Sequence, residues 1–228
     1  WAGAWRQRLA LSAAAIAAKH AGRVEDEAAL RDAVLLTRPG DDVGPAGRML
    51  LAWRRLAARP AEELLTEASL AGVLEALGLA RDDETARELA GEFRQLGASD
   101  GTVGMLTGAF AAAERHGFGR VLGSWAADAL LAQRLGWSHS VPLLGTEAAV
   151  GRGVARPRAA STAVAAIDIE AGRERAKNLL VVQARAALHA IDLSAELERR
   201  ADRLATVTPK LRAKAADTVV EKLLSEDA

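Results

Sequence analysis

Glycine and proline divide this chain into short segments that are rich in alanine and leucine. Alanine makes up nearly a quarter of the sequence, tyrosine is absent and β-branched residues are sparse, so helix propensity is high and strand propensity is low. Apolar residues recur at helical spacing within the segments, most clearly over residues 120–135. The pattern predicts an all-α protein, a compact alanine-rich bundle of about 9–11 helices.

The breaks between segments predict where individual helices begin and end. Pro60 is placed to open a helix that ends at Gly78, because proline is favoured in the first turn of a helix. Neither glycine nor proline occurs over residues 173–208, which predicts either one long helix or a helical hairpin that breaks at residues 192–194. A last helix is predicted to begin at Pro209.

A glycine-, proline- and arginine-rich segment at residues 151–160 is the predicted domain boundary. It separates an N-terminal helical bundle at residues 1–150 from C-terminal helices at residues 161–228. We expect these C-terminal helices to pack on the bundle, with a helical hairpin subdomain as one arrangement.

Large side chains must supply much of the core, because each alanine buries little apolar surface. Four aromatic residues in the helical segments are therefore the predicted anchors: Trp53, Phe93, Phe110 and Trp125. Alanine layers between them would let the helix axes approach closely.

Composition excludes several classes of function. The chain has no cysteine, so disulfides, thiolate metal sites and cysteine nucleophiles are excluded. Lys plus Arg and Asp plus Glu both number 30, so the formal net charge is zero and no overall charge attracts nucleic acid or anionic lipid. No apolar run approaches the roughly 20 residues of a membrane span. Four histidines lie far apart, and no catalytic constellation is recognisable. We expect a cytoplasmic protein, not bound to membranes, that is not an enzyme and needs no metal or cofactor.

The loop at residues 38–48 is a candidate ligand site, because it combines glycines, prolines, acids and arginines before a helix. Its candidate residues for an anionic ligand are Arg38, Asp41, Asp42 and Arg48. The alternative is a tight turn whose acids cap the following helix and pair with its arginines.

Basic residues near the boundary and near the C-terminus are candidates for nucleic-acid binding. These residues are Arg152, Arg156, Arg158, Lys210, Arg212 and Lys214. The alternative is a solvated helix face, because acidic residues are interleaved with neighbouring arginines at ion-pairing distance along the helix.

Several stretches, taken together and in order, resemble a bacterial family known as domain of unknown function number fourteen-oh-three. The stretches are residues 5–11 (WRQRLAL), 25–32 (EDEAALRD), 38–48 (RPGDDVGPAGR), 51–56 (LAWRRL), 131–137 (LAQRLGW), 141–144 (VPLL) and 209–214 (PKLRAK). The resemblance implies a cytoplasmic α-proteobacterial protein, encoded on plasmids in some members, and further residues before the position of Trp1. It implies no reaction.

Three hypotheses about function follow from these features. The first is a non-enzymatic helical module that binds another protein, or a second copy of itself, within a bacterial and in some cases plasmid-associated system. The second is a nucleic-acid-binding regulator that uses the arginines after Gly151. The third is a small anionic-ligand site at residues 38–48.

Overall fold

The computed structural model describes residues 2–79, 82–98, 101–148, 164–210 and 215–225. Within these residues the chain forms nine α-helices and no strand, which confirms the predicted all-α class. The helices are α1 (Ala2–His20), α2 (Glu27–Leu35), α3 (Gly44–Ala58), α4 (Glu67–Ala76), α5 (Asp83–Gly97), α6 (Thr102–Arg115), α7 (Gly119–Arg134), α8 (Val164–Val207) and α9 (Ala216–Ser225). Three single-turn 3₁₀ helices are η1 (Ala61–Glu63), η2 (Leu144–Thr146) and η3 (Thr208–Lys210).

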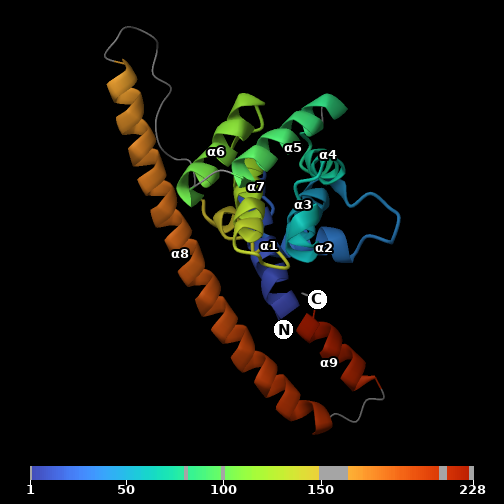
Figure 1. Cartoon of the computed structure of the whole chain (residues 1–228). Coiled ribbons are helices and arrows are strands. Elements are labelled where there is room, and N and C mark those ends of the chain that lie inside the picture. The colour runs from blue at the N-terminus through green and yellow to red at the C-terminus, as the bar shows by residue number, and fades with distance from the viewer. Residues whose placement is uncertain (1, 80–81, 99–100, 149–163, 211–214, 226–228) are drawn as a thin grey trace.

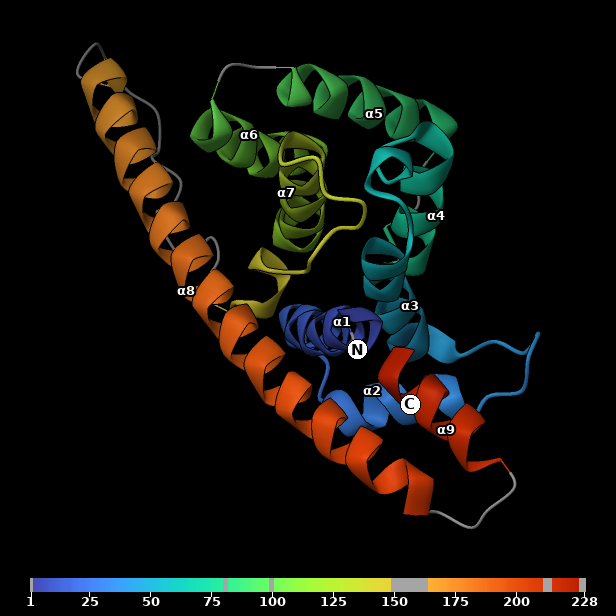
Figure 2. The same ribbon diagram turned by 60° about the horizontal axis from the view of Figure 1, so that its bottom comes forward.

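Helix α1 occupies the middle of the molecule. It packs against α3, η2, α2, α8 and α9, and it lies between α8 and α3 in both views (Figures 1 and 2). Helices α4 to α7 form the other end of the bundle, where α6 packs closely on α7. The long helix α8 runs along one side of this bundle, and α9 returns to contact α1.

Side chains cap the starts of three helices. The side chain of Asp26 accepts a hydrogen bond from the Ala29 amide at 2.9 Å, and that of Asp82 accepts from the Thr85 amide at 3.0 Å. Thr66 caps α4 in the same way. Each cap satisfies an amide of the first helical turn, which has no partner within the helix.

Two predicted helix starts are wrong. Helix α4 begins at Glu67 rather than at Pro60, because the amide of Ala61 donates to the carbonyl of Ser138 at 2.9 Å and ties this segment to a distant loop. Pro209 lies in η3, and α9 begins only at Ala216. Tertiary contact, rather than proline preference, decides the first case.

Of the two alternatives for residues 173–208, the structure shows the long helix and not the hairpin with a break at residues 192–194, because α8 continues without interruption from Val164 to Val207. Leu193 packs against the core from the middle of this segment. A helix that keeps an apolar face in contact with the bundle has no reason to turn there. The hairpin arrangement therefore forms later, between α8 and α9.

Large aromatic anchors stand among small residues in the core, as predicted. Trp53, Phe93 and Trp125 are at most 1% exposed, and Phe110 is 9% exposed. A Cβ atom placed on Gly123 of α7 would lie 2.6 Å from a ring carbon of Phe110 on α6. Because real Cβ contacts are longer, glycine is what allows these two helices to pack so closely.

Tryptophan indoles also link helices through hydrogen bonds. Trp125 Nε1 donates to the carbonyl of Ala52 in α3 at 3.1 Å, and Trp5 Nε1 donates to Ala190 in α8 at 2.9 Å. The buried Nε1 of Trp53 has no acceptor among the described residues. Trp125 thus joins α7 to α3 by both packing and a hydrogen bond.

Replacing Trp125 with Ala is predicted to lower the free energy of unfolding by about 3–5 kcal/mol, because a large buried ring and its hydrogen bond are both lost. Urea denaturation followed by circular dichroism measures this change. Trp137→Ala is the matched control, because Trp137 is 38% exposed and its loss should cost less than about 1 kcal/mol. Equal losses for the two variants would contradict the placement of Trp125 in the core.

Candidate functional site

The predicted ligand loop at residues 38–48 forms a compact turn. The Asp42 carboxylate accepts a hydrogen bond from the Gly44 amide at 2.9 Å and lies 3.8 Å from Arg48 Nη1. The Asp41 amide donates to the Arg38 carbonyl at 3.0 Å. The structure therefore joins Asp42 to Arg48, as the capping alternative predicts, whereas the side chains of Arg38 and Asp41 make no ion pair with any described residue. A ligand site at this loop stays a prediction.

The predicted nucleic-acid-binding residues lie outside the described residues. This holds for Arg152, Arg156, Arg158, Arg212 and Lys214, and for the side chain of Lys210. In α8, Arg200 pairs with Glu196 one helical turn away, which is the pattern of a solvated helix face. A nucleic-acid interface therefore stays a prediction.

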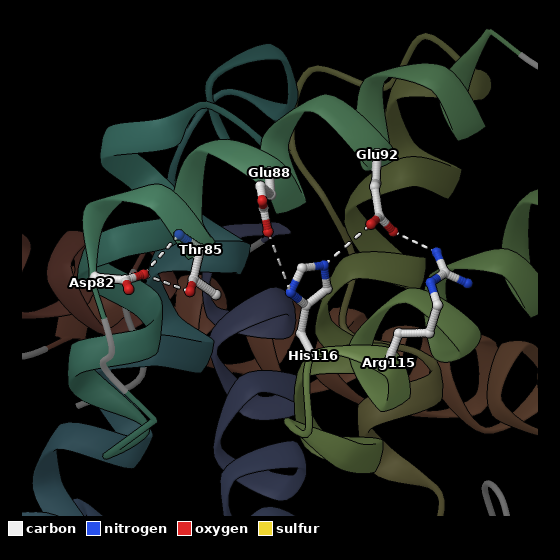
Figure 3. A network of polar contacts seen from close by, with 6 residues as sticks. All are labelled: Asp82, Thr85, Glu88, Glu92, Arg115 and His116. Carbon is white, nitrogen blue, oxygen red and sulfur yellow. Dashed lines mark hydrogen bonds and ion pairs between the residues drawn. The ribbon is translucent and has the colours of Figure 1, made fainter.

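His116 lies in a polar cluster between α5 and the C-terminal end of α6 (Figure 3). Its Nε2 is 3.1 Å from Glu92 Oε1 and its Nδ1 is 3.9 Å from Glu88 Oε2, while Arg115 Nη2 is 2.5 Å from Glu92 Oε2. The two glutamates are spaced i, i+4 on α5 and therefore share one helix face. Sequence reasoning missed this cluster because the carboxylates come from a different helix.

Hydrogen bonds and ion pairs between the acidic side chains of α5 and the basic side chains of Arg115 and His116 dominate the electrostatics of this cluster. Burial opposes ionisation of Glu92, but hydrogen bonds from His116 and Arg115 outweigh it and lower the pKa of Glu92 below its ordinary value. Within the part of the chain that the structure describes, no three His, Asp or Glu side chains are grouped as a metal site requires. The contacts of Glu88 and Glu92 with His116 and Arg115 join α5 to the C-terminal end of α6.

Asp128 is the most deeply buried carboxylate of the described chain, at 1% exposure in the middle of α7. Its two oxygens accept hydrogen bonds from three successive backbone amides at the start of η2. Leu143 donates at 2.9 Å, Leu144 at 3.0 Å and Gly145 at 3.2 Å. A side chain from the core thus caps a helical turn that lies far along the chain.

The contacts of Asp128 fix the segment between α7 and η2 on the bundle. Ser140, which is fully buried, donates to the Asp128 carbonyl at 3.0 Å. Gln133 of α7 donates to the carbonyl of Ala61 at 2.7 Å, beside the Ala61–Ser138 backbone hydrogen bond. Sequence reasoning missed Asp128, although one signal was available: a single acid stands on the same helix face as Trp125 and Leu131.

Burial raises the pKa of Asp128 from 3.8 to about 7, and the three amide hydrogen bonds act in the opposite direction. Between about pH 4 and pH 7 the folded chain therefore keeps a proton that the unfolded chain has released. The contribution of this group to stability is complete below pH 4 and is lost as the pH rises towards 7. The stability that Asp128 gives to the η2 segment therefore falls as the pH rises towards 7.

Helix α8 has two apolar faces on opposite sides. The inner face packs on the bundle and includes the buried residues Leu179, Val182, Ala186 and Ala190. The outer seam, which we define as Val181, Ala184, Leu188 and Ile191, follows the i, i+3, i+7, i+10 spacing of a heptad. Val181 is 52% exposed, Leu188 63% and Ile191 62%, and none of the other described helices lies on the outer side of α8 (Figure 1).

Replacing Asp128 with Ala is predicted to lower the free energy of unfolding by about 3 kcal/mol or more, because three buried amides lose their acceptor. Asp128→Asn cannot ionise, so the decline in stability between pH 4 and pH 7 should flatten relative to the parent chain. Urea denaturation at several pH values measures both effects.

Ser140→Ala serves as the control for these variants. It removes one hydrogen bond to the Asp128 backbone, which costs about 1 kcal/mol, but leaves the carboxyl group in place. Its pH profile should therefore parallel that of the parent. Identical pH profiles for the parent and Asp128→Asn would contradict the role of Asp128.

Comparisons with known proteins give one family. Neither the curated proteins nor the solved structures contain a significant match to the chain. The model of a family described as Protein of unknown function (DUF1403) matches residues 1–228, in agreement with the resemblance of the sequence motifs. The chain therefore belongs to the DUF1403 family.

Proposed function

We propose that this protein is a non-enzymatic interaction module that pairs with a second copy of itself through the outer seam of α8. The observation that carries the proposal is the position of this seam. Three large aliphatic side chains, each more than half exposed, lie at heptad spacing on a helix whose opposite face is already anchored. Exposed apolar stripes of this kind are typical of helix–helix interfaces.

The seam is complementary to itself when two copies run antiparallel. With a two-fold axis at the level of residue 186, Val181 faces Ile191 of the second copy and Ala184 faces Leu188. Leu188 then packs against the small Ala184, and Val181 packs against Ile191 as a second apolar pair. Antiparallel helix dipoles also favour this orientation over the parallel one.

Each end of the seam carries both acidic and basic side chains. Glu174 and Lys177 lie 3.9 Å apart at one end, and Glu198 and Arg199 are exposed at the other. About the axis at residue 186, Glu174 faces Glu198 of the second copy, and Lys177 and Arg199 lie within one helical turn of these acids and offset their charge. Each end of the dimer would therefore combine acidic with basic side chains.

Replacing Leu188 with Glu is predicted to convert the dimer to a monomer, because it places a charge in the apolar seam. Sedimentation velocity over a range of protein concentrations measures the change in association. Leu36→Glu is the matched control, because Leu36 is 81% exposed and lies away from α8. If the parent chain is a monomer at every concentration, or if Leu188→Glu associates as the parent does, the proposal is wrong.

The orientation of the two copies can be tested by disulfide cross-linking, because the chain has no cysteine of its own. Residues 174 and 199 are about 37 Å apart along a helix. An antiparallel dimer predicts that a mixture of Glu174→Cys and Arg199→Cys chains forms mixed disulfides under mild oxidation, whereas either variant alone does not. Non-reducing electrophoresis separates these products. Efficient cross-linking of each variant with itself would instead require parallel helices.

A further inference from the structure

A cavity of about 380 Å³ opens between the C-terminal end of α1, α3, the end of α4 and the start of α7. Its walls are mainly apolar, and the side chains that matter here are Ala17, Met49, Leu77, Leu79, Phe118 and Val121. The volume lies within the range of small-molecule sites in proteins. This cavity is separate from the outer seam of α8.

The polar side chains of the cavity lining are both basic in type. They are His20, at the end of α1, and Arg120, in the first turn of α7, and the described lining contains no carboxylate. An apolar pocket with an arginine at its rim favours a ligand that is itself apolar at one end and negatively charged at the other.

Arg120 is half-buried, yet among the described residues no side chain or backbone group accepts a hydrogen bond from its guanidinium or pairs with it. Other arginines with carboxylates at hand form ion pairs, for example Arg115 with Glu92 and Arg185 with Glu147. Partial burial of a cation without a counterion costs free energy, which an anionic ligand would recover. Arg120 is therefore the group that would recognise the negative charge.

A second, much smaller cavity of about 10 Å³ adjoins the first and shares Ala17, His20, Arg120 and Val121 with it. Its volume is close to that of one water molecule, so the ligand cannot extend far in this direction. Glu147 lines this smaller cavity, but its carboxylate already lies 3.9 Å from Arg185 of α8. Among the described residues, no ion pair or hydrogen bond joins Glu147 to Arg120.

We infer that the larger cavity binds an apolar monocarboxylate, a medium-chain fatty acid or an aromatic acid of similar size. The apolar body of the ligand packs against Met49, Leu79 and Phe118, and its carboxylate pairs with Arg120. The first turn of α7 contributes in the same direction, because its N-cap, Phe118, offers no side-chain acceptor for the exposed amides.

Isothermal titration of the full chain with decanoate, 1-naphthoate, decanol and decyltrimethylammonium tests this inference, all below their micellar concentrations. Saturable one-to-one binding of decanoate or 1-naphthoate, with no comparable binding of the cationic amphiphile, is the expected result. The two acids distinguish a straight-chain site from an aromatic one. Failure of both acids to bind would overturn the inference.

Two variants show whether binding occurs in this cavity. Arg120→Gln should weaken binding of the acid about tenfold or more and leave the weak binding of decanol unchanged, because only the charge-assisted contact is lost. Val121→Phe should weaken acid and alcohol together by filling the cavity. Thermal unfolding without ligand verifies that both variants fold.

Arg87→Gln is the matched control, because it removes one positive charge from the exposed surface of α5. It should bind the acid as the parent chain does. Acid binding that is unchanged in both Arg120→Gln and Val121→Phe, or weakened equally in Arg87→Gln, would overturn the inference. Leu188→Glu should also bind the acid normally, so this inference and the pairing of α8 can fail independently.

Discussion

The hydrogen bonds from three backbone amides to the buried Asp128 carboxylate join the middle of α7 to the start of η2. They place η2 against the core, where a Cβ on Gly145 would lie 2.3 Å from a ring carbon of Trp53. They also bring Glu147, at the end of η2, to Arg185 of α8. The central helix, the large aromatic anchor and the long outer helix are thus positioned through one side chain. An isolated buried acid would be costly, but one that receives three amides replaces much of the hydration that it loses.

The remaining core depends on small residues more than on large ones. Helix α1 buries alanines on several sides, including Ala10, Ala13, Ala14 and Ala18, and so it can lie in the centre with partners all around it. Such packing gains close contact between helix axes but little apolar area per residue. Stability is therefore concentrated at the few aromatic anchors and at polar links such as the Trp125–Ala52 hydrogen bond.

Local chemistry made part of this architecture predictable from the sequence. The helix class, the caps at Asp26 and Asp82 and the aromatic anchors depend on propensity, capping and side-chain size, which act within a few residues. The sequence left one long helix and a hairpin open for residues 173–208, because Asp192 and Ser194 could cap a new helix only if the chain turned there. Leu193 packs against the core, and this contact stabilises a continuous helix through residues 192–194.

The candidate sites were harder to predict because their residues come from separate helices. His116 shows no metal or catalytic spacing on its own helix, and its partners Glu88 and Glu92 are on α5. The cavity beside Arg120 combines the ends of four helices, whose relative positions no local pattern specifies. The contacts of residues 38–48, by contrast, are local, and so the capping alternative could be predicted from the sequence alone.

The contact between Glu147 and Arg185 connects the two proposals physically. In an antiparallel pair centred at the level of residue 186, the Arg185 side chains of both copies would approach each other, and repulsion between them would oppose pairing. Glu147 lies 3.9 Å from Arg185 and offsets that charge within each copy. Because the Glu147 side chain is only 15% exposed and follows directly on η2, its position is set by the Asp128 anchor. The same segment thus places a carboxylate beside α8, where it offsets a positive charge next to the seam, and within the described chain this carboxylate makes no ion pair with Arg120.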